Sequence, residues 1–508
     1  MPTYLSPGVY VEEVPAATRP IAGVGTAVAG FVGFAADGPF HEPVLVTNWT
    51  QFTNTFGDMT ERYSLGKAIY GFFNNGGGRA YVIRVPTGSD GASAPIAELA
   101  TKADKKVPAF RVEAIDAGAA NVSVKVASAE ADGDEAQFTI TITSDAGEES
   151  FTGTLGKGRN NLATQVNAKS KVVKIETLDA PAALVASGLQ ESTVALAKPA
   201  NLPAASVEPG DLIGDSSRRT GFTGFETLEE ITMILAPDVV TAHAQGLIDL
   251  DAVKAIQTGM LNHCELMGNR MAILDTPTGL NAQQASDWRM NTTNFDSKFG
   301  VMYWPWVQVF DPTLGKNASL PPSGALAGVW SRNDDTRGVF KAPANEVLLG
   351  AVGVDYAVSR GEMDMLNPMG VNSIKSFPGR GIRVWGARTL SSDAEWRYVN
   401  VRRYFNYLEE SILQGTQWCV FEPNDERLWG RIRRTISAFL VNEWRSGALF
   451  GASPQQAYFV KCDGENNTAE SIDLGMVIVE IGVAPVKPAE FVIFQLSQFS
   501  GGVSLVNE

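Results

Sequence analysis

The sequence contains little cysteine and little histidine. It has three cysteines, Cys264, Cys419 and Cys462, and three histidines among 508 residues. Three scattered cysteines cannot form a disulfide framework, so we expect a reducing compartment or a disulfide-free particle. The sequence also lacks CxxC, HExxH and ordered carboxylate-loop patterns, which are typical of metal sites. We therefore expect neither a metal nor a cofactor.

The usual signs of catalysis are also missing. The histidines, His41, His243 and His263, are not placed near a serine or cysteine nucleophile in the sequence. The glycine-rich stretches GVGTAVAG and NNGGGRAYVIRV lack the spacing of a dinucleotide fingerprint and the ending of a phosphate loop. In FPGRGIRVWGARTL, Arg380 and Arg383 could grip a phosphate, but a tight turn entering a strand is the preferred interpretation. We expect no catalytic residues.

The chain lacks a positive net charge and a long apolar run. Its formal charge is −15 and its pI is near 4.9, which argues against nucleic acid as the main partner because phosphate binding needs clustered cations. The apolar stretch at residues 21–36 is shorter than the roughly 20 residues of a membrane-spanning helix, and it is rich in glycine. We interpret it as a buried strand. We expect no signal peptide and no membrane insertion.

Tryptophan is absent from residues 87–224, although the chain has ten tryptophans. This region is rich in Ala, Ser, Thr, Asp and Gly, and it contains the hairpin-like strands NVSVKVASA and AQFTITITS. Such a shift of composition predicts a separate β-rich domain, inserted in the surrounding unit.

The flanking regions show strands that alternate with helices. TAVAGFVGFA, RAYVIRV, RMAILDTP and FGVMYWPWVQVFDP are predicted strands, whereas NWTQFTNTFG and YSLGKAIYGFFNNGG are predicted helices. This alternation predicts an α/β fold with a largely parallel sheet, α+β over the whole chain. We assign residues 21–86 and 225–366 to this α/β domain, residues 367–484 to a C-terminal domain with two long helices, and residues 1–20 and 485–508 to extended arms.

One concentration of charge stands out. Arg427, Arg431 and Arg434 share one face of a predicted helix over residues 425–445, and its apolar residues occupy the opposite face. A solvated face of an amphipathic helix is the simple interpretation. On so acidic a protein, however, a positive stripe without acidic residues also suggests docking to a negatively charged partner.

The C-terminal end is unexpectedly apolar. The run Phe491-Val492-Ile493-Phe494 follows the strand-like stretch GMVIVEIGVA and is separated from it by Pro485 and Pro488. An unpaired apolar edge strand invites aggregation. Such a strand is tolerable if it pairs with another chain.

Several of these stretches resemble the contractile tail sheath proteins. The resemblance is carried by NPMGVNSIKSFPGRGIRVWGARTL, WRYVNVRRYFNYLEESI and IGVAPVKPAEFVIFQLSQF, and by the opening YLSPGVYVEEV with FVGFAADGP. It covers the N-terminal arm, residues 21–86 and residues 225–508, and the last stretch is most similar to extracellular injection systems of the antifeeding-prophage type. The region 87–224 falls where the outer domain of this family varies.

The resemblance implies a mechanical function. A sheath subunit polymerises helically around an inner tube and contracts to drive the tube into a target cell, without a cofactor. It implies that the arms, through Val9, Tyr10 and Val11 and through Phe491, Ile493 and Phe494, pair with neighbouring copies, and that Arg427, Arg431 and Arg434 contact the tube. Baseplate and terminal cap proteins are the other implied partners. The protein would be made in the bacterial cytoplasm for a phage tail or a phage-tail-like particle.

Two alternatives belong to other classes. The first is a cell-surface or carbohydrate-binding module that oligomerises through its arms. The second is an enzyme that uses PGRGIR for an anionic substrate, although no general base lies nearby in the sequence. Only a sheath would form long tubes or rings.

Overall fold

The structure is a computed structural model of the chain. It describes most of the protein, with gaps near both ends and in the tryptophan-free region. The residues Val9, Tyr10 and Val11 of the predicted N-terminal arm lie outside the described residues. The described residues are 20–60, 62–86, 96–103, 107–115, 122–129, 136–144, 147–156, 160–178, 188–196, 207–311 and 315–495.

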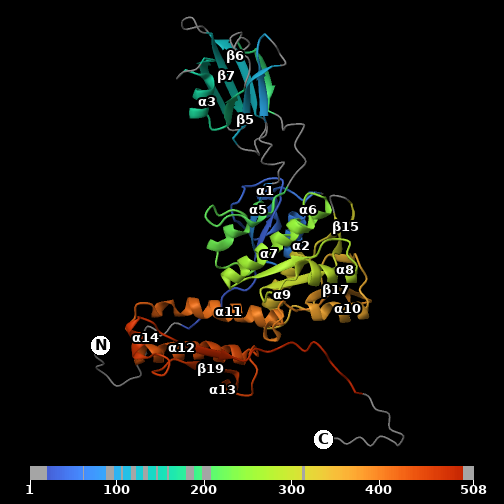
Figure 1. Ribbon diagram of the computed structural model, residues 1–508, viewed down its shortest axis with the longest axis vertical. Helices are drawn as coiled ribbons and strands as arrows, with labels where there is room; N and C mark the ends of the chain where they lie inside the picture. Colours follow the sequence, from blue (N-terminus) through green and yellow to red (C-terminus); the bar gives the residue numbers. More distant parts are fainter. Residues whose placement is uncertain are drawn as a thin grey trace, which may run out of the picture.

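An eight-stranded sheet lies in the middle of the molecule (Figure 1), in the order β18-β17-β13-β12-β11-β1-β3-β2. Neighbouring strands from β17 to β3 pair in parallel, whereas the edge strands β18 and β2 pair antiparallel. The predicted, largely parallel sheet is confirmed. The strands are β1 (Val28–Gly33), β2 (Val44–Val46), β3 (Arg79–Arg84), β11 (Met233–Leu235), β12 (Met271–Asp275), β13 (Gly300–Trp304), β17 (Val371–Phe377) and β18 (Gly381–Trp385).

Helices cover both faces of this sheet (Figure 1). Every residue of β1 is buried, as expected for a parallel strand between two helical layers. On one face Phe31 packs edge-on against Phe72 of α2, with 5.6 Å between ring centroids. On the other face Val28 and Val32 share a core cluster with residues of α7. The helices are α1 (Trp49–Phe56), α2 (Leu65–Asn74), α6 (Asp238–Ala244), α7 (Leu250–Met267), α8 (Ala282–Asp287), α9 (Ser323–Arg337) and α10 (Arg360–Leu366).

The sheet crosses two of the predicted domain boundaries. Residues 207–224 were predicted to belong to the inserted domain, but Leu212 in α5 (Pro209–Ile213) and Phe222 in the 3₁₀ helix η1 (Gly221–Thr227) are buried in the core of the sheet. The predicted boundary at residue 367 also falls inside the sheet, because β17 and β18 extend it to Trp385. Apolar burial and strand pairing therefore assign these residues to what we call the sheet layer, residues 28–86 and 207–390.

Shorter elements complete the sheet layer. A three-stranded sheet, in the order β15-β14-β16, lies beside the main one, so that the predicted strand FGVMYWPWVQVFDP is divided between β13 and β14. The remaining elements are β14 (Val307–Asp311), β15 (Lys316–Leu320), β16 (Ala351–Val354), the π-helical turn η2 (Trp288–Thr293) and the 3₁₀ turn η3 (Asn367–Met369).

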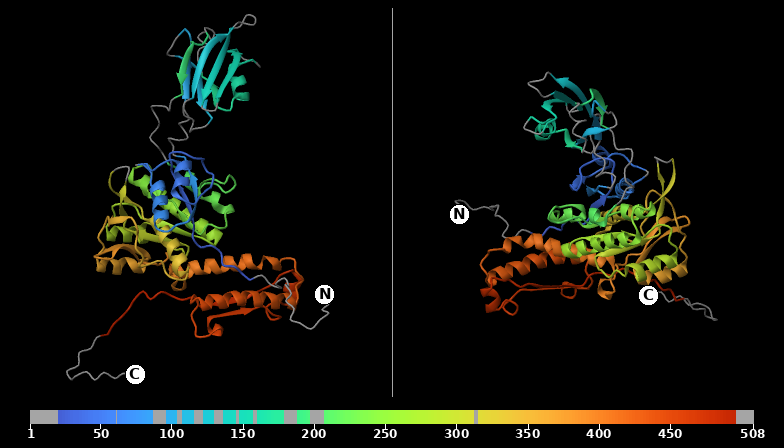
Figure 2. Two further views of the ribbon diagram at one scale, coloured as in Figure 1. Left: turned by 180° about the vertical axis from the view of Figure 1, so that it is seen from behind. Right: turned by 45° about the horizontal axis from the view of Figure 1, so that its top comes forward.

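The described part of the tryptophan-free region up to residue 196 forms a β-rich unit with its own core, apart from the sheet layer (Figures 1 and 2). Its sheets have the orders β4-β5-β9 and β10-β6-β7-β8, and apolar side chains such as Val124 and Ile140 are buried between them. The predicted strands NVSVKVASA and AQFTITITS correspond to β6 and β7. The elements are β4 (Ile96–Ala100), β5 (Pro108–Ala114), β6 (Ser123–Ala129), β7 (Gln137–Ser144), β8 (Gly147–Thr154), α3 (Leu162–Lys169), β9 (Val173–Thr177) and β10 (Ser192–Ala195).

On the other side of the sheet layer lies a helical layer (Figure 1). Helices α11 (Val399–Thr416) and α12 (Glu426–Arg445) share a core that also contains Tyr404, Leu408 and Cys462. The layer ends in a small antiparallel sheet of two strands, β19 and β20. Its other elements are η4 (Ala394–Trp396), η5 (Gln417–Cys419), α13 (Pro454–Ala457), β19 (Tyr458–Lys461), α14 (Ala469–Asp473) and β20 (Glu480–Val483).

The strand predicted over GMVIVEIGVA is shorter than expected. Only Glu480–Val483 pair with β19. Upstream, the side chain of Asn467 binds the backbone of Ile478: its Oδ1 accepts from the N–H at 2.7 Å, and its Nδ2 donates to the carbonyl at 3.0 Å. Because this amide takes up both backbone groups of Ile478, the ladder begins only after it.

Candidate functional site

Helix α12 carries the predicted arginine stripe. The helix begins after Asp425, whose Oδ1 accepts the backbone N–H groups of Arg427 and Leu428 at 3.0 and 2.8 Å. This N-cap satisfies two of the otherwise unpaired donors of the first turn. The predicted apolar face is buried in the core of the helical layer: Leu428, Ile432, Ile436, Phe439 and Leu440.

The arginines of α12 have different environments. Arg427 and Arg434 are exposed, and among the described residues no carboxylate lies within 4 Å of either guanidinium. Arg431 is engaged: it pairs with Glu422 at 3.5 Å and lies over the Trp418 ring, 4.3 Å from the ring centroid. The structure therefore places the three predicted arginines on one open face, where two retain an unneutralised charge.

The connection between α11 and α12 contains exposed apolar side chains. Phe421 is fully exposed and has a backbone φ of 65°. This conformation is unfavourable for a bulky residue and costs roughly 1–3 kcal/mol. Val420 beside it is also exposed. Exposed apolar side chains beside a strained backbone position mark a surface that another molecule can cover.

The small sheet of the helical layer has open edges. Within the described part of the chain, β19 pairs with β20 alone and β20 with β19 alone. Phe459 and Ile481 of these strands are exposed, as is the neighbouring Phe450. An edge strand offers unpaired N–H and C=O groups to a further strand. The helical layer therefore presents two positions at which another extended segment can pair.

The C-terminal segment first follows the helical layer and then leaves it. The N–H of Ala484 donates to the Ala457 carbonyl at 2.9 Å, and the N–H of Val486 donates to the Ala448 carbonyl at 3.2 Å. From there the segment runs away from the end of the layer that holds α14 (Figures 1 and 2). The predicted arm residues Phe491, Ile493 and Phe494 are between 72% and 83% exposed, in extended backbone that forms no strand. Pro485, the first of the two prolines that separate the stretches, is held in place, because Val486 after it remains hydrogen-bonded.

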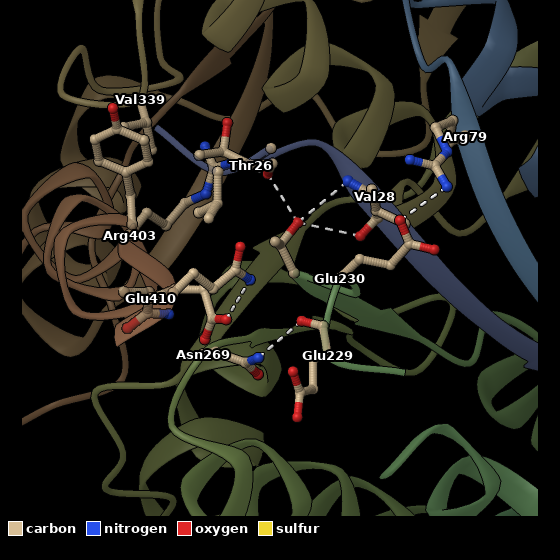
Figure 3. A pocket seen from close by; sticks show the side chains of 15 residues that line it. Thr26, Val28, Arg79, Glu229, Glu230, Asn269, Val339, Arg403 and Glu410 are labelled. Atoms are coloured by element: carbon tan, nitrogen blue, oxygen red, sulfur yellow. Dashed lines mark hydrogen bonds and ion pairs between the residues drawn. The ribbon is translucent and has the colours of Figure 1, made fainter. Parts of the chain in front are cut away.

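The segment just after residue 20 is held between the two layers. Ile21 is buried in the core of the helical layer, and the N–H of Val24 donates to Ser411 Oγ at 3.1 Å. Gly23 allows a close approach here, because a Cβ at this position would lie 2.2 Å from the Tyr407 hydroxyl and would force that ring to move. Residues of this segment line a small cavity of about 190 Å³ at the junction of the layers (Figure 3).

A buried ion pair closes this junction. Arg403 of α11 binds both carboxylate oxygens of Asp334 on α9, at 2.9 and 2.5 Å, and both side chains are 4% exposed. Thr26 completes the network: its hydroxyl donates to Asp334 Oδ2 at 2.6 Å, and its carbonyl accepts from Arg403 at 3.0 Å. The N-terminal segment, the sheet layer and the helical layer thus meet at one charge pair. No local pattern could indicate this pair, because its members are 69 positions apart.

The remaining candidates for chemistry have structural roles. Arg383 donates to the carbonyls of Arg380 and Asn345, so PGRGIR is a turn that enters β18, as preferred from the sequence. His263 is buried next to Arg270, and burial together with that charge lowers its pKa to about 3. Across the described residues, no group of three or more His, Cys, Asp or Glu side chains could hold a metal ion. Nor does any helix in the described ranges have the length and apolarity to cross a membrane.

Two family models match the chain side by side. The model described as "Phage tail sheath protein central domain" matches residues 234–390, and the model described as "Phage tail sheath C-terminal domain" matches residues 391–499. Their border coincides with the passage from the sheet layer to the helical layer. Together the two models cover more than half of the chain.

Relatives and solved structures agree with these matches. The tail sheath protein of Burkholderia phage BcepMu is 24% identical, over 96% of this chain and 95% of that protein. A putative prophage major tail sheath protein of Pseudomonas aeruginosa is 28% identical over 47% of this chain and 60% of that protein. The helical sheath of the anti-feeding prophage in its contracted state has a TM-score of 0.59 and 24% identity, and it covers 98% of this chain and 100% of that chain. The sheath complex of the extracellular contractile injection system PVC, also contracted, has a TM-score of 0.56, 23% identity and coverage of 98% and 99%.

Proposed function

The chain belongs to the phage tail sheath family, and from this premise we propose how its parts act in the particle. It is a structural subunit of a helical contractile sheath, in a phage tail or a phage-tail-like particle, and it is not an enzyme. The two sheath domains that match over residues 234–499 carry this conclusion. A cell-surface or carbohydrate-binding module is not favoured, because a tail sheath protein matches nearly the full length of the chain.

We propose that the subunits surround an inner tube and that contraction of the sheath drives this tube into a target cell. The subunit would need no cofactor, because the work comes from the difference in packing between two lattices. Baseplate and terminal cap proteins would bind the two ends of the sheath. The similarity of this chain to a chain of the baseplate structure of the anti-feeding prophage, with a TM-score of 0.59 and 23% identity, supports the baseplate contact.

We propose that the arms join neighbouring subunits by strand exchange. The C-terminal segment carries Phe491, Ile493 and Phe494 away from its own subunit, and the open edges of β19 and β20 can accept extended segments from other copies. Val9, Tyr10 and Val11 would supply the matching N-terminal strand. Each apolar side chain that becomes fully buried contributes roughly 1.5–3 kcal/mol. A head-to-tail contact of this kind, which does not close a ring, generates an open helix of subunits.

We propose that the arginine face of α12 contacts the tube. Its support is the exposure of Arg427 and Arg434 and the absence of acidic side chains between residues 427 and 441, in a chain whose net charge is −15. The exposed Phe421 lies beside Glu422, the partner of Arg431, and would add an apolar contact at the end of the same face. The β-rich unit, on the far side of the sheet layer from α12 in Figure 1, would then form the outside of the sheath.

Electron microscopy of the purified protein tests this function. We expect helical tubes or rings from the full-length chain, and decoration of tubes when the tube protein of the same particle is added. A protein that stays monomeric or dimeric under all assembly conditions, with and without the tube protein, would contradict the proposal.

A further inference from the structure

The C-terminal segment is attached to the sheet layer by one carboxylate. Glu490 Oε1 accepts from Arg388 Nε at 2.9 Å and from Asn367 Nδ2 at 2.7 Å. Glu490 Oε2 accepts from Arg388 Nη2 at 2.7 Å and from the Tyr398 hydroxyl at 3.1 Å. The Arg388 and Glu490 side chains are only 11% and 19% exposed. A two-point arginine contact with two further donors is strong and fixes the orientation of the carboxylate.

The groups that bind this carboxylate are held by the fold. Asn372 of β17 is fully buried, and its side chain forms two hydrogen bonds with the backbone of Arg388. Its Oδ1 accepts from the N–H at 2.7 Å, and its Nδ2 donates to the carbonyl at 2.8 Å. Arg388 and Tyr398 also form an isolated antiparallel bridge. Arg388 Nη1 donates to the Asn367 carbonyl at 3.3 Å. The donors therefore lie ready at the edge of the sheet layer and at the start of α11, independently of the arm.

Glu490 lies where the segment stops being attached. Among hydrogen bonds to other described residues, those of residues 487–495 all involve the Glu490 side chain. The segment borders a groove of about 1,020 Å³ that it lines together with Trp385 and Ala387. Directly after Glu490, the exposed fraction rises to 72% at Phe491 and 68% at Val492. The last fixed point and the first exposed apolar residue are thus adjacent in the chain.

We propose that Arg388, Asn367 and Tyr398 form a carboxylate-binding site that fixes the C-terminal arm at Glu490, so that the exchangeable arm begins at Phe491. This inference rests on the proposed strand exchange. The site sets the point and direction of departure, and therefore the register in which Phe491, Ile493 and Phe494 reach an acceptor. An arm released at Glu490 would be free after Val486, which keeps its own hydrogen bonds, and would sample many more arrangements before pairing.

The charge of Glu490 is part of this site. Burial alone would raise its pKa, but hydrogen bonds from Arg388 and Asn367, with the Arg388 charge, outweigh burial and hold the pKa below its usual value. A lowered pKa in the folded state means that the carboxylate form is the one that binds. The attachment is therefore present above the ordinary pKa of glutamate and is lost as the pH falls through the lowered value.

Limited digestion with chymotrypsin tests the attachment in the full-length chain. A protease needs several extended residues on both sides of the cut, so the fixed Glu490 should protect the bond after Phe491 but not the bond after Phe494. We expect Glu490→Gln and Arg388→Lys to speed cleavage after Phe491 at least tenfold, while cleavage after Phe494 changes less than twofold. Glu395→Gln, which removes an exposed carboxylate three residues from Tyr398, is the matched control and should change neither rate.

Assembly provides the second measurement. We expect Glu490→Gln to raise the protein concentration needed for self-assembly about tenfold, with the melting temperature nearly unchanged. Equal cleavage after Phe491 in the wild type and in Glu490→Gln would overturn the attachment. Faster cleavage with unchanged assembly would overturn its positioning role. Failure of strand exchange itself would appear differently, as normal assembly of a chain that lacks residues 491–508, whatever the cleavage rates.

Discussion

The sheet layer and the helical layer differ in degree: the sheet layer encloses acidic side chains and exposes a few aromatic ones, such as Phe310, whereas the helical layer exposes more of its phenylalanines. In the sheet layer, even acidic side chains are enclosed: Asp238 caps α2, and Asp275 accepts from the N–H and hydroxyl of Ser323 at the start of α9. In the helical layer, Phe421 and Phe459 are exposed, and the terminal segment runs into solvent. A region that encloses its charges is built to keep one shape. A region that exposes aromatic side chains is built to be covered by other molecules.

This contrast separates two kinds of expected mutational effect. Changes in the sheet layer should lower stability, and changes on the open surfaces of the helical layer should abolish assembly while the subunit remains folded. The Arg403–Asp334 pair lies at the junction and should show both effects.

Removing the exposed arm should produce the largest effect on assembly. A chain without residues 491–508 keeps Glu490 and its four hydrogen bonds, and it should melt like the wild type but form no tubes. A chain without residues 489–508 loses the attachment as well and should melt slightly lower. Negative-stain microscopy and thermal denaturation measure the two properties. If the shorter truncation aggregates and loses helical circular dichroism, residues 491–508 belong to the core of their own subunit.

Reversing the arginine face should abolish binding to tubes. Changing Arg427, Arg431 and Arg434 together to Glu leaves the buried face of α12 intact, so the circular dichroism spectrum should not change. Assembly on purified tubes should be lost, and high salt should weaken wild-type assembly in the same direction. The control changes Lys125, Lys169 and Lys174 to Glu, because these exposed lysines lie on the β-rich unit. Normal decoration of tubes by the α12 variant would leave the stripe as a solvated helix face.

Breaking the junction should cause the largest loss of stability. Asp334→Asn leaves the Arg403 charge buried without its partner, which typically costs about 3–5 kcal/mol. Urea denaturation should therefore show a lower free energy of unfolding, and assembly should fail as the layers separate. Asp335→Asn changes the exposed neighbouring carboxylate and should be neutral. Equal stability of the two variants would mean that the layers are held together by apolar packing alone.

The sheet layer should also show a pH dependence that the arms do not share. Burial raises the pKa of Asp275 to about 7, against hydrogen bonds from Ser323. The folded state therefore binds this proton more tightly than the unfolded chain, whose aspartate titrates near 3.9, and the free energy of unfolding falls as the pH rises between these values. In Asp275→Asn this fall should be smaller by at least about 1.4 kcal/mol, the equivalent of one pKa unit. Denaturation of the unassembled protein at pH 5 and pH 8 measures the difference. A variant with an unchanged slope would contradict it.

Replacing the β-rich unit should have the smallest effect on either property. We expect a chain in which a Gly/Ser linker replaces residues 87–206 to assemble into tubes of smaller outer diameter. Replacing residues 87–224 should instead destabilise the subunit, because it removes Leu212 and Phe222 from the core of the sheet layer. If both versions unfold, the β-rich unit is needed for the fold of the sheet layer.

Local patterns predicted much of this fold. The strands β1, β12 and β13 were visible because burial on both faces of a parallel sheet leaves continuous apolar stretches. The helices α1 and α2 were visible because glycine follows the end of each. The stripe of α12 was visible because helical periodicity places residues four positions apart on one face. The domain borders predicted at residues 224 and 367 were misplaced. A change in composition locates the border between two units less precisely than the burial of side chains does.

The sequence by itself determined which segments form strands and helices, that the C-terminal run is apolar, and that α12 carries positive charge on one side. These properties depend on residues that are close in the chain. Only the tertiary structure decided that Asp334 meets Arg403, that Glu490 meets Arg388 and that the exposed apolar run begins directly after this last contact, at Phe491. Each of these contacts joins residues separated by 69 or more positions. No periodicity records such a pairing, because the packing of the layers brings the two partners together.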